Sequence, residues 1–378
     1  MAKETDAQIV EFFVKNQGEL SQERSDFLLP QIVDFVRKEK WVNIKPEYQR
    51  RQVWDKKKKS RLIESLLMNI PVPPIYLYER DYSRYEVMDG QQRLNSIIEF
   101  YENRFKLSSL ESWKIMNGKT YADLPQKVQR GLDRRRISAT VIISDLTDRP
   151  YGPEDVRRQV FDRLNTGGMQ LNSQELRNCL YPGRFNELLI KLSGHKVFTD
   201  VFAIPPHEKN ITEGNRVSEP LANDTLYKRM IDCELVLRFF TFRRSEGFRS
   251  SIPKALDKCM VEYRHISSSE AERLEEIFST RLDVAVSIFG NDAFYLPGKK
   301  RSKRPSVPLY DATLIAIDRL YNHRELLINN NTKLKKALAE LLEDKDQFET
   351  IIGKPGTAKA IRARIKLIQD AFVAAAGI

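Results

Sequence analysis

The stretch 85–94, YEVMDGQQRL, decides how the first half of this chain folds. Residues 84–88 favour a strand, and from Leu94 onward the apolar residues Leu94, Ile97 and Tyr101 recur at helical spacing. A strand is therefore predicted to run directly into a helix. The turn between them consists of a carboxylate, a glycine, two amides and an arginine.

Two interpretations of this turn are consistent with its chemistry. A helix N-terminus presents unpaired backbone N–H groups and the positive end of the helix dipole, which suits a phosphate. Gly90 would then let the ligand approach the backbone closely, and the guanidinium of Arg93 would donate two parallel hydrogen bonds to phosphate oxygens. The plainer interpretation is helix capping, in which Asp89 is the cap, Gly90 makes the turn and Arg93 is solvated. The turn alone leaves both interpretations open.

Composition predicts a folded protein of two domains. The chain has 378 residues, of which 41% are hydrophobic and 10% aromatic, and domains average about 150 residues. No apolar run approaches the ~20 residues that span a bilayer, and the first residues lack the apolar core of a secretory signal. Cys179, Cys233 and Cys259 lie in apolar helical patterns, which predicts buried free thiols. We therefore expect a cytoplasmic protein without a membrane partner.

The pattern along the chain predicts an α+β fold: a small mixed α/β domain over 1–180, followed by a mainly helical domain over 181–378. The tight-turn pair Asn117-Gly118 predicts a hairpin, and the polar segment 195–220 predicts a long loop. Strands are predicted at 41–44, 75–78, 84–88 and 137–143. Helices are predicted within 7–40, at 55–68, from 91, at 155–164, from 172, and at 221–243, 268–289, 307–322, 331–345 and 357–375.

The formal net charge of +11 suggests a polyanionic partner such as DNA, although acidic residues are mixed among the basic ones. Basic runs occur at 56–59, 134–136 and 299–304, and for each run taken alone a solvated face is the favoured interpretation. The third run lies in a loop bounded by glycine, proline and serine, where it could contact a phosphate backbone. It makes the candidate DNA-binding residues Lys299, Lys300, Arg301, Lys303 and Arg304.

Several familiar catalytic signatures are missing from the sequence. There is no complete P-loop motif, no pair of histidines at His-x-x-x-His spacing and no Cys-x-x-Cys. The sequence therefore predicts no metal site built from protein ligands. Two further polar segments remain, at 48–51 and 161–176. Asn165, ahead of two glycines, could simply end a helix, or Arg163 and Asn165 could complete a nucleotide pocket.

Several motifs in the first half of the chain, taken in order, resemble one family. It is the domain found at the N-terminus of GmrSD-type modification-dependent restriction enzymes and of SspE-like phage-defence proteins. The string DGQQR is specific to that family. The matching motifs are YQR at 48–50, Trp54, RLIESLL at 61–67, IPVPPI at 70–75, DGQQRL at 89–94 and FDRLNTGGMQL at 161–171.

The resemblance implies a ParB/sulfiredoxin-like fold and nucleoside triphosphate hydrolysis. By position, Asp89, Gln91 and Arg93 would be catalytic: Asp89 would orient water or a metal-bound phosphate, and Arg93 would neutralise developing charge. Gly90 would admit the phosphate. The remaining residues implied to line the nucleotide pocket are Gln49, Arg50, Gln92, Arg163 and Asn165. The implied cofactors are a nucleoside triphosphate and Mg²⁺, the metal being held mainly through the triphosphate.

One departure from the family limits the expected activity. Full-length members carry a nuclease domain with an Asp-His-x-x-Pro-like motif, and none of the four histidines here has such neighbours. We therefore expect a nucleotide-binding, NTP-hydrolysing regulatory subunit of a restriction or phage-defence system. Its partners would be DNA and a separately encoded nuclease or modification enzyme, and homo-oligomerisation is left open. The alternatives are a non-hydrolysing, ParB-like DNA-binding module that nucleotide switches, and a scaffold that keeps only the fold.

Overall fold

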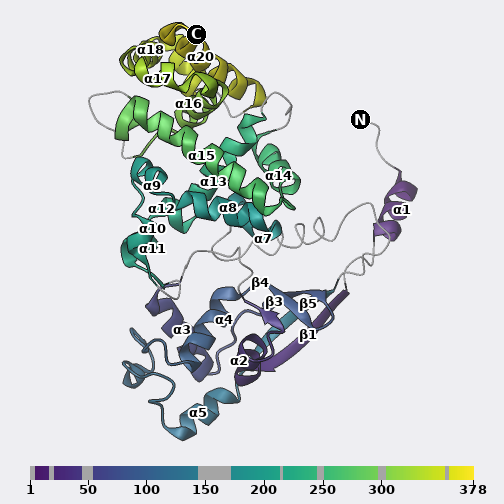
Figure 1. The fold of residues 1–378 in the computed structure, drawn as a ribbon. Coiled ribbons are helices and arrows are strands. Elements are labelled where there is room, and N and C mark those ends of the chain that lie inside the picture. Colours follow the sequence, from purple (N-terminus) through teal and green to yellow (C-terminus); the bar gives the residue numbers. More distant parts are fainter. Residues whose placement is uncertain are drawn as a thin grey trace. The chain divides into compact units, whose positions relative to one another are not determined.

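A computed structural model describes residues 5–16, 21–44, 54–143, 172–212, 216–244, 251–296, 304–353 and 357–378. The chain forms two compact units (Figure 1), with the division between residues 170 and 171. The sequence places the division at 180, and the functions assigned to the two domains stay predictions. Each unit is described by itself below.

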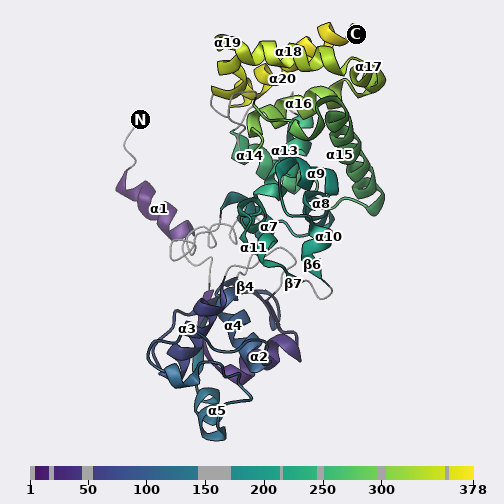
Figure 2. The same ribbon diagram turned by 90° about the vertical axis from the view of Figure 1, so that its left-hand side faces the viewer.

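The first unit combines a five-stranded sheet with helices (Figure 2). Its elements are α1 (Asp6–Asn16), β1 (Ser21–Leu28), α2 (Leu29–Arg37), β2 (Val42–Asn43), α3 (Lys56–Leu67), β3 (Ile75–Asp81), β4 (Arg84–Asp89), α4 (Gln91–Tyr101), the 3-10 helix η1 (Lys114–Met116), α5 (Gln126–Asp133) and β5 (Arg136–Ile143).

The sheet has the order β1-β5-β3-β4-β2. β1 pairs antiparallel with β5, and β3 pairs antiparallel with β4. β3 with β5 and β2 with β4 are parallel pairs. The core lies between one sheet face and the apolar faces of α2, α3 and α4, since Leu77 and Val141 cluster with Ile32, Ile63 and Leu94.

The second unit is almost entirely helical and is built around phenylalanines; Phe239 and Phe278, for example, meet edge to face at 5.3 Å. Its elements are α7 (Ser173–Leu180), α8 (Arg184–Ser193), α9 (Lys196–Phe202), α10 (His207–Asn210), β6 (Ile211–Thr212), β7 (Arg216–Val217), α11 (Glu219–Asn223), α12 (Thr225–Lys228), α13 (Ile231–Arg243), α14 (Ile252–Glu262), α15 (Ser268–Phe289), η2 (Gly290–Asp292), α16 (Val307–Arg319), η3 (Tyr321–His323), α17 (Arg324–Asn329), α18 (Asn331–Glu343), α19 (Lys345–Phe348), the π-helical turn η4 (Glu349–Gly353) and α20 (Ala358–Ala376).

The α+β fold class is confirmed, and so are the strand–turn–helix at 84–101 and the helix predicted at 55–68, whose N-cap is Asp55. Cys233 and Cys259 are buried free thiols, as expected; Cys179 lies outside the residues whose side chains are described. The helix predicted at 155–164 also lies outside the described residues.

Three local predictions are wrong. The Asn117-Gly118 pair does make a tight turn, with Gly118 at φ +84°, but η1 precedes it where a hairpin would need a strand. The segment 195–220 contains α9, in which buried Phe198, Val201 and Phe202 stand at helical spacing, but the helix has only seven residues, too short a run for the pattern to be recognised. β1 lies within the segment 7–40, where only helices were predicted. It is an edge strand with mostly exposed polar residues, so it lacks the apolar alternation that indicates a strand.

Candidate functional site

The DGQQR turn lies at an edge of the sheet where three strand ends meet. β2 and β4 are parallel, so their carboxyl ends share this edge, and β3 begins here because it runs antiparallel to β4, with Tyr76 opposite Asp89. Ile44 after β2, Pro74 before β3 and the turn after β4 therefore lie close together. Main-chain carbonyls just beyond a strand end have no neighbouring strand to donate a hydrogen bond to them, so several of them lie together at this edge.

Gly90 joins β4 to α4 in a left-handed conformation, with φ +96° and ψ 6°. A Cβ at this position would lie 2.4 Å from Cγ2 of Ile75, a distance at which atoms overlap. Glycine is therefore required both by the backbone angle and by packing against β3. This requirement comes from the fold itself and is independent of any ligand.

Arg93 is held by two oxygens at this edge. Its Nη2 donates to the carbonyl oxygen of Pro74 at 3.0 Å and to Oδ2 of Asp89 at 2.9 Å. The side chain of Arg93 is only 14% exposed, whereas that of Asp89 is 52% exposed. Asp89 is thus the ion-pair partner of Arg93 rather than the cap of α4, and Arg93 is not solvated. The Nε of Arg93 is buried and has no hydrogen-bond partner among the described residues.

The two glutamines of the turn differ in their surroundings. Nε2 of Gln91 donates to the carbonyl oxygen of Ile44 at 2.8 Å, which fastens α4 to the end of β2. Gln92 is half-buried, and within the described part of the chain its side chain makes no hydrogen bond. Gln92 therefore has an amide available at the same edge.

The N-terminus of α4 is open. Its N-cap is Gly90, which has no side chain to accept a hydrogen bond, and Leu94 is the first residue whose N–H bonds back, to the carbonyl of Gly90 at 3.0 Å. By contrast, Asp55 caps α3 through its side chain. An uncapped helix start beside a buried guanidinium with a spare N–H is a favourable place for an anion.

Glu64 is a buried carboxylate whose contacts sequence reasoning missed. Its buried carboxylate accepts backbone N–H groups from Ser112 and Trp113, each at 2.8 Å, and from Glu111 at 3.3 Å. Burial raises the pKa of Glu64, but the three backbone donors together outweigh it, so the net shift is downward. The one signal in the sequence was an acidic residue inside the otherwise apolar inner face of the predicted helix.

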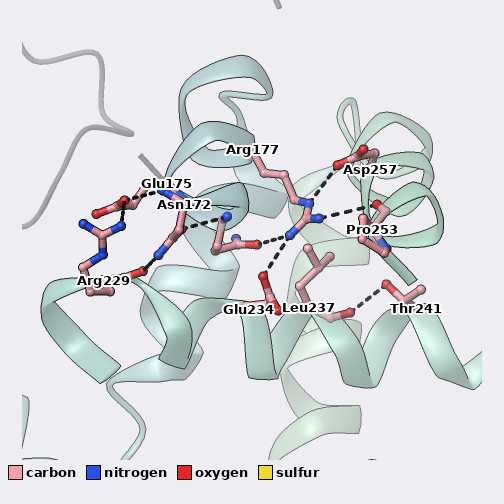
Figure 3. A network of polar contacts seen from close by, with 10 residues as sticks. Asn172, Glu175, Arg177, Arg229, Glu234, Leu237, Thr241, Pro253 and Asp257 are labelled. Carbon is pink, nitrogen blue, oxygen red and sulfur yellow. Dashed lines mark hydrogen bonds and ion pairs between the residues drawn. The ribbon is translucent and has the colours of Figure 1, made fainter. Parts of the chain in front are cut away.

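Gln49, Arg50, Arg163 and Asn165 lie outside the described residues. The described part of the second polar segment begins at Asn172, which caps α7 (Figure 3). Its Oδ1 accepts from the N–H groups of Gln174 and Glu175, and Glu175 accepts the N–H of Asn172 in return. These reciprocal bonds form a capping box, and the helix predicted from 172 is confirmed.

Arg177, one turn further along α7, is buried among acceptors from two other helices (Figure 3). Its side chain is 3% exposed and pairs with Glu234 of α13 at 3.0 Å and with Asp257 of α14 at 2.8 Å. It also donates to the carbonyl of Pro253 and to Gln174. Arg177 therefore ties α7, α13 and α14 together.

Arg304 is described, whereas Lys299, Lys300, Arg301 and Lys303 lie outside the described residues. The guanidinium of Arg304 donates to the carbonyl oxygen of Phe202 at 2.7 Å and forms an ion pair with Asp224. These contacts give Arg304 a role inside the second unit. Among the described residues, no group of three histidine, cysteine or acidic side chains could hold a metal ion, and no helix could span a membrane.

Residues 31–182 match the family model described as the GmrSD restriction endonuclease, N-terminal domain. Over this stretch, which is less than half of the chain, the sequence is similar to the GmrSD N-terminal domain. The match includes the DGQQR edge, α3 with Glu64, and α7 with its capping box. It supports a role for the chain in a restriction or phage-defence system, and DNA as a partner of that system.

No curated protein matches the chain, and no solved structure matches it either. The ParB/sulfiredoxin-like fold that the resemblance implies therefore stays a prediction. The GmrSD domain extends through α7 and two residues beyond it. Because α7 belongs to the second compact unit, the domain as matched includes the first helix of that unit.

Proposed function

We propose that the chain binds a nucleoside triphosphate at the N-terminus of α4 and hydrolyses it, as a regulatory subunit of a DNA restriction or phage-defence system. The observation that carries this proposal is the open start of α4 beside Arg93, whose buried Nε has no partner among the described residues. Buried donors without acceptors are costly, and a phosphate oxygen would satisfy them. The GmrSD match supports the restriction context.

Each residue of the turn has a definite part in this proposal. Arg93, fixed in place by Pro74 and Asp89, supplies preorganised positive charge where the γ-phosphate develops charge. Gln92 donates to the nucleotide or orients water through its amide. Gln91 uses Nε2 to hold the strand edge together, which leaves its Oε1 to orient the attacking water.

The turn offers few protein ligands for Mg²⁺. Asp89 is the half-exposed carboxylate of the turn, and it is already paired with Arg93. A divalent ion would therefore be held mainly through the triphosphate, with few protein ligands. When bound, Mg²⁺ would neutralise phosphate charge.

A second function is favoured by one observation. Asp89 lies 2.9 Å from Arg93, so its carboxylate is engaged and is a weak candidate for activating water. The chain would then bind nucleotide without hydrolysing it, and the bound nucleotide would switch DNA binding.

The deciding experiment measures phosphate release and nucleotide binding with Mg²⁺ and each of the four common NTPs, with and without duplex DNA. Gln92→Ala is the first variant, because the side chain of Gln92 bonds to no described residue and its loss should leave the fold intact. Arg93→Lys keeps the charge but loses Nε and the planar fork. We expect each variant to lower turnover on the order of 100-fold, the usual effect of removing one transition-state donor.

The matched controls are Gln126→Ala, in the first turn of α5, and Arg37→Lys. In the wild type, Arg37 pairs with Glu102 at the surface. Both controls should keep full turnover. Wild-type turnover in folded Gln92→Ala and Arg93→Lys proteins would reject the site. Tight nucleotide binding without phosphate release would establish the switch instead of the hydrolase.

A further inference from the structure

The exposed face of α3 is strongly basic and adjoins one loop. Lys57 and Lys58 lie four and three positions before Arg61, so each is a neighbour of Arg61 on the helix surface, and all three are exposed. The helix is joined to the segment 107–119 by the hydroxyl of Ser60, which accepts the N–H of Ser108 at 3.0 Å. Arg61 also pairs with Glu111. The basic stripe therefore runs alongside this loop.

The loop 107–119 is fastened at several points along its length. Glu64 of α3 accepts three of its backbone N–H groups. Its two ends are joined by Leu107 N–H to the carbonyl of Lys119 at 2.9 Å, and by Gly118 N–H to the carbonyl of Leu107 at 2.7 Å. The side chain of Asn117 accepts the N–H of Leu110 inside the loop. Such a loop presents its outer side chains in a preorganised arrangement.

The exposed side chains of this loop include two lysines, one glutamate, several polar residues and one apolar residue. Lys106 precedes the loop, Lys114 stands at its tip and Lys119 at its end, and all three are exposed. Beside Lys114, Ile115 is 86% exposed. We call the combined face of Lys57, Lys58, Lys106, Lys114, Lys119 and Ile115 the α3–loop surface.

The acidic groups near this surface are already engaged. Glu64 binds backbone N–H groups, and Glu111 pairs with Arg61. Asp123 accepts the N–H and hydroxyl of Thr120, and these bonds lower its pKa, with Lys119 and Lys106 adding to the effect. These carboxylates keep their negative charge, so the surface is basic because its exposed lysines outnumber them.

We propose that the α3–loop surface binds the phosphate backbone of duplex DNA, with Ile115 contacting the groove between the phosphates. This inference rests on the proposed role in a DNA restriction system and names where the DNA is held. Lysines contribute to DNA binding by neutralising phosphates, and proteins that bind the minor groove frequently insert an apolar side chain between base steps.

A duplex fits this surface better than a single strand does. Proteins that bind single strands stack bases on aromatic side chains. The aromatic residues of this region, Trp113 and Tyr121, are half-buried, and Tyr121 stacks on Tyr101 with ring centres 4.5 Å apart. The exposed apolar residue is the aliphatic Ile115, which cannot serve as a stacking platform.

The test measures the affinity of the full chain for a short labelled duplex over a range of salt concentrations. The variant Lys57→Gln/Lys58→Gln/Lys114→Gln should bind more weakly. The slope of log K against log salt should become shallower by about 0.9 for each phosphate that the variant no longer neutralises. Ile115→Ser should also lower the affinity, but should leave the slope unchanged, because it removes no charge. Both variants alter exposed side chains and should melt at the wild-type temperature.

The control Lys333→Gln/Lys335→Gln/Lys336→Gln removes the same charge from exposed positions on α18 and should keep wild-type affinity. Equal losses in the two triple variants would overturn the surface, because net charge alone would then explain binding. Tighter binding of single-stranded DNA, RNA or anionic vesicles than of duplex would overturn the choice of partner. Failure of the wild-type chain to bind duplex would also overturn it. None of these outcomes touches the nucleotide site, which phosphate release tests separately.

Discussion

Gly90 shows how closely the turn and the sheet depend on each other at the scale of single residues. Gly90→Ala would place a Cβ 2.4 Å from Cγ2 of Ile75, in a backbone at φ +96°. We expect the free energy of unfolding to fall by about 2–4 kcal/mol, the sum of backbone strain and overpacking. Chemical denaturation of the two proteins measures this difference.

Gly118→Ala is the matched control. Gly118 has φ +84°, but a Cβ there would meet nothing within 4 Å. Its substitution isolates the backbone cost, which is on the order of 1 kcal/mol. Equal losses for Gly90→Ala and Gly118→Ala would show that contact with Ile75 does not constrain the turn.

Glu64 predicts a pH dependence of stability. Burial raises its folded pKa, but the backbone N–H groups of the loop together lower it by more. A lowered folded pKa contributes stability above the unfolded pKa, and that stability is lost as the pH falls through the folded pKa. Glu64→Gln should therefore be less stable at neutral pH, by about 1–3 kcal/mol, and should lose less on acidification.

Denaturation curves at several pH values below neutrality measure this effect. Glu111→Gln is the control, because Glu111 is exposed and pairs with Arg61 at the surface. It should follow the wild-type acid profile closely. An unchanged profile in Glu64→Gln would mean that the loop does not depend on the charge of this carboxylate.

The sequence located the candidate site but not the partners of its residues. The DGQQR turn could be placed at a helix start, because strand and helix patterns flank it. The contact of Arg93 with Pro74 could not be predicted, because it depends on the register of β3 against β4. The same holds for Gln91 and Ile44, which meet through the parallel pairing of β2 and β4.

At the scale of elements, α7 is held in place by buried charge. Arg177 is paired with Glu234 and Asp257, and its removal would leave both carboxylates without this partner in a largely buried environment. We expect Arg177→Ala to lower the free energy of unfolding by about 3–5 kcal/mol. Arg273→Ala, which breaks the exposed pair with Glu270, should cost at most about 1 kcal/mol. A small effect of Arg177→Ala would show that α7 is held by its apolar face instead.

Elements with a long periodic pattern and a clear cap were predicted well. α3 and α15 begin after Asp55 and Ser267, whose side chains accept backbone N–H groups of the first turn. Elements that are stabilised mainly by contacts with other elements were not predicted. β1 is ordered by pairing with β5, and α9 by burying Phe198, neither of which leaves a periodic signal in so short a segment.

At the scale of the whole molecule, each of the two compact units has a hydrophobic cluster of its own. One cluster contains Leu94 and Ile63 and fills the first unit; the other contains Leu282 and Phe278 and fills the second. The position of the division was harder to predict. The capping box at Asn172 marks a helix start, but it carries no information on which core α7 joins.

Two cores predict two thermal unfolding transitions that respond to different mutations. Leu94 and Leu282 are both fully buried, one in each cluster. Leu94→Ala and Leu282→Ala should each remove about 2–5 kcal/mol through reduced burial and the cavity left behind. Each should lower the midpoint of one transition, on the order of 10 °C, and leave the other in place. Scanning calorimetry of the two variants beside the wild type measures both midpoints. A single transition that both substitutions lower equally would mean that the two cores melt as one cooperative unit.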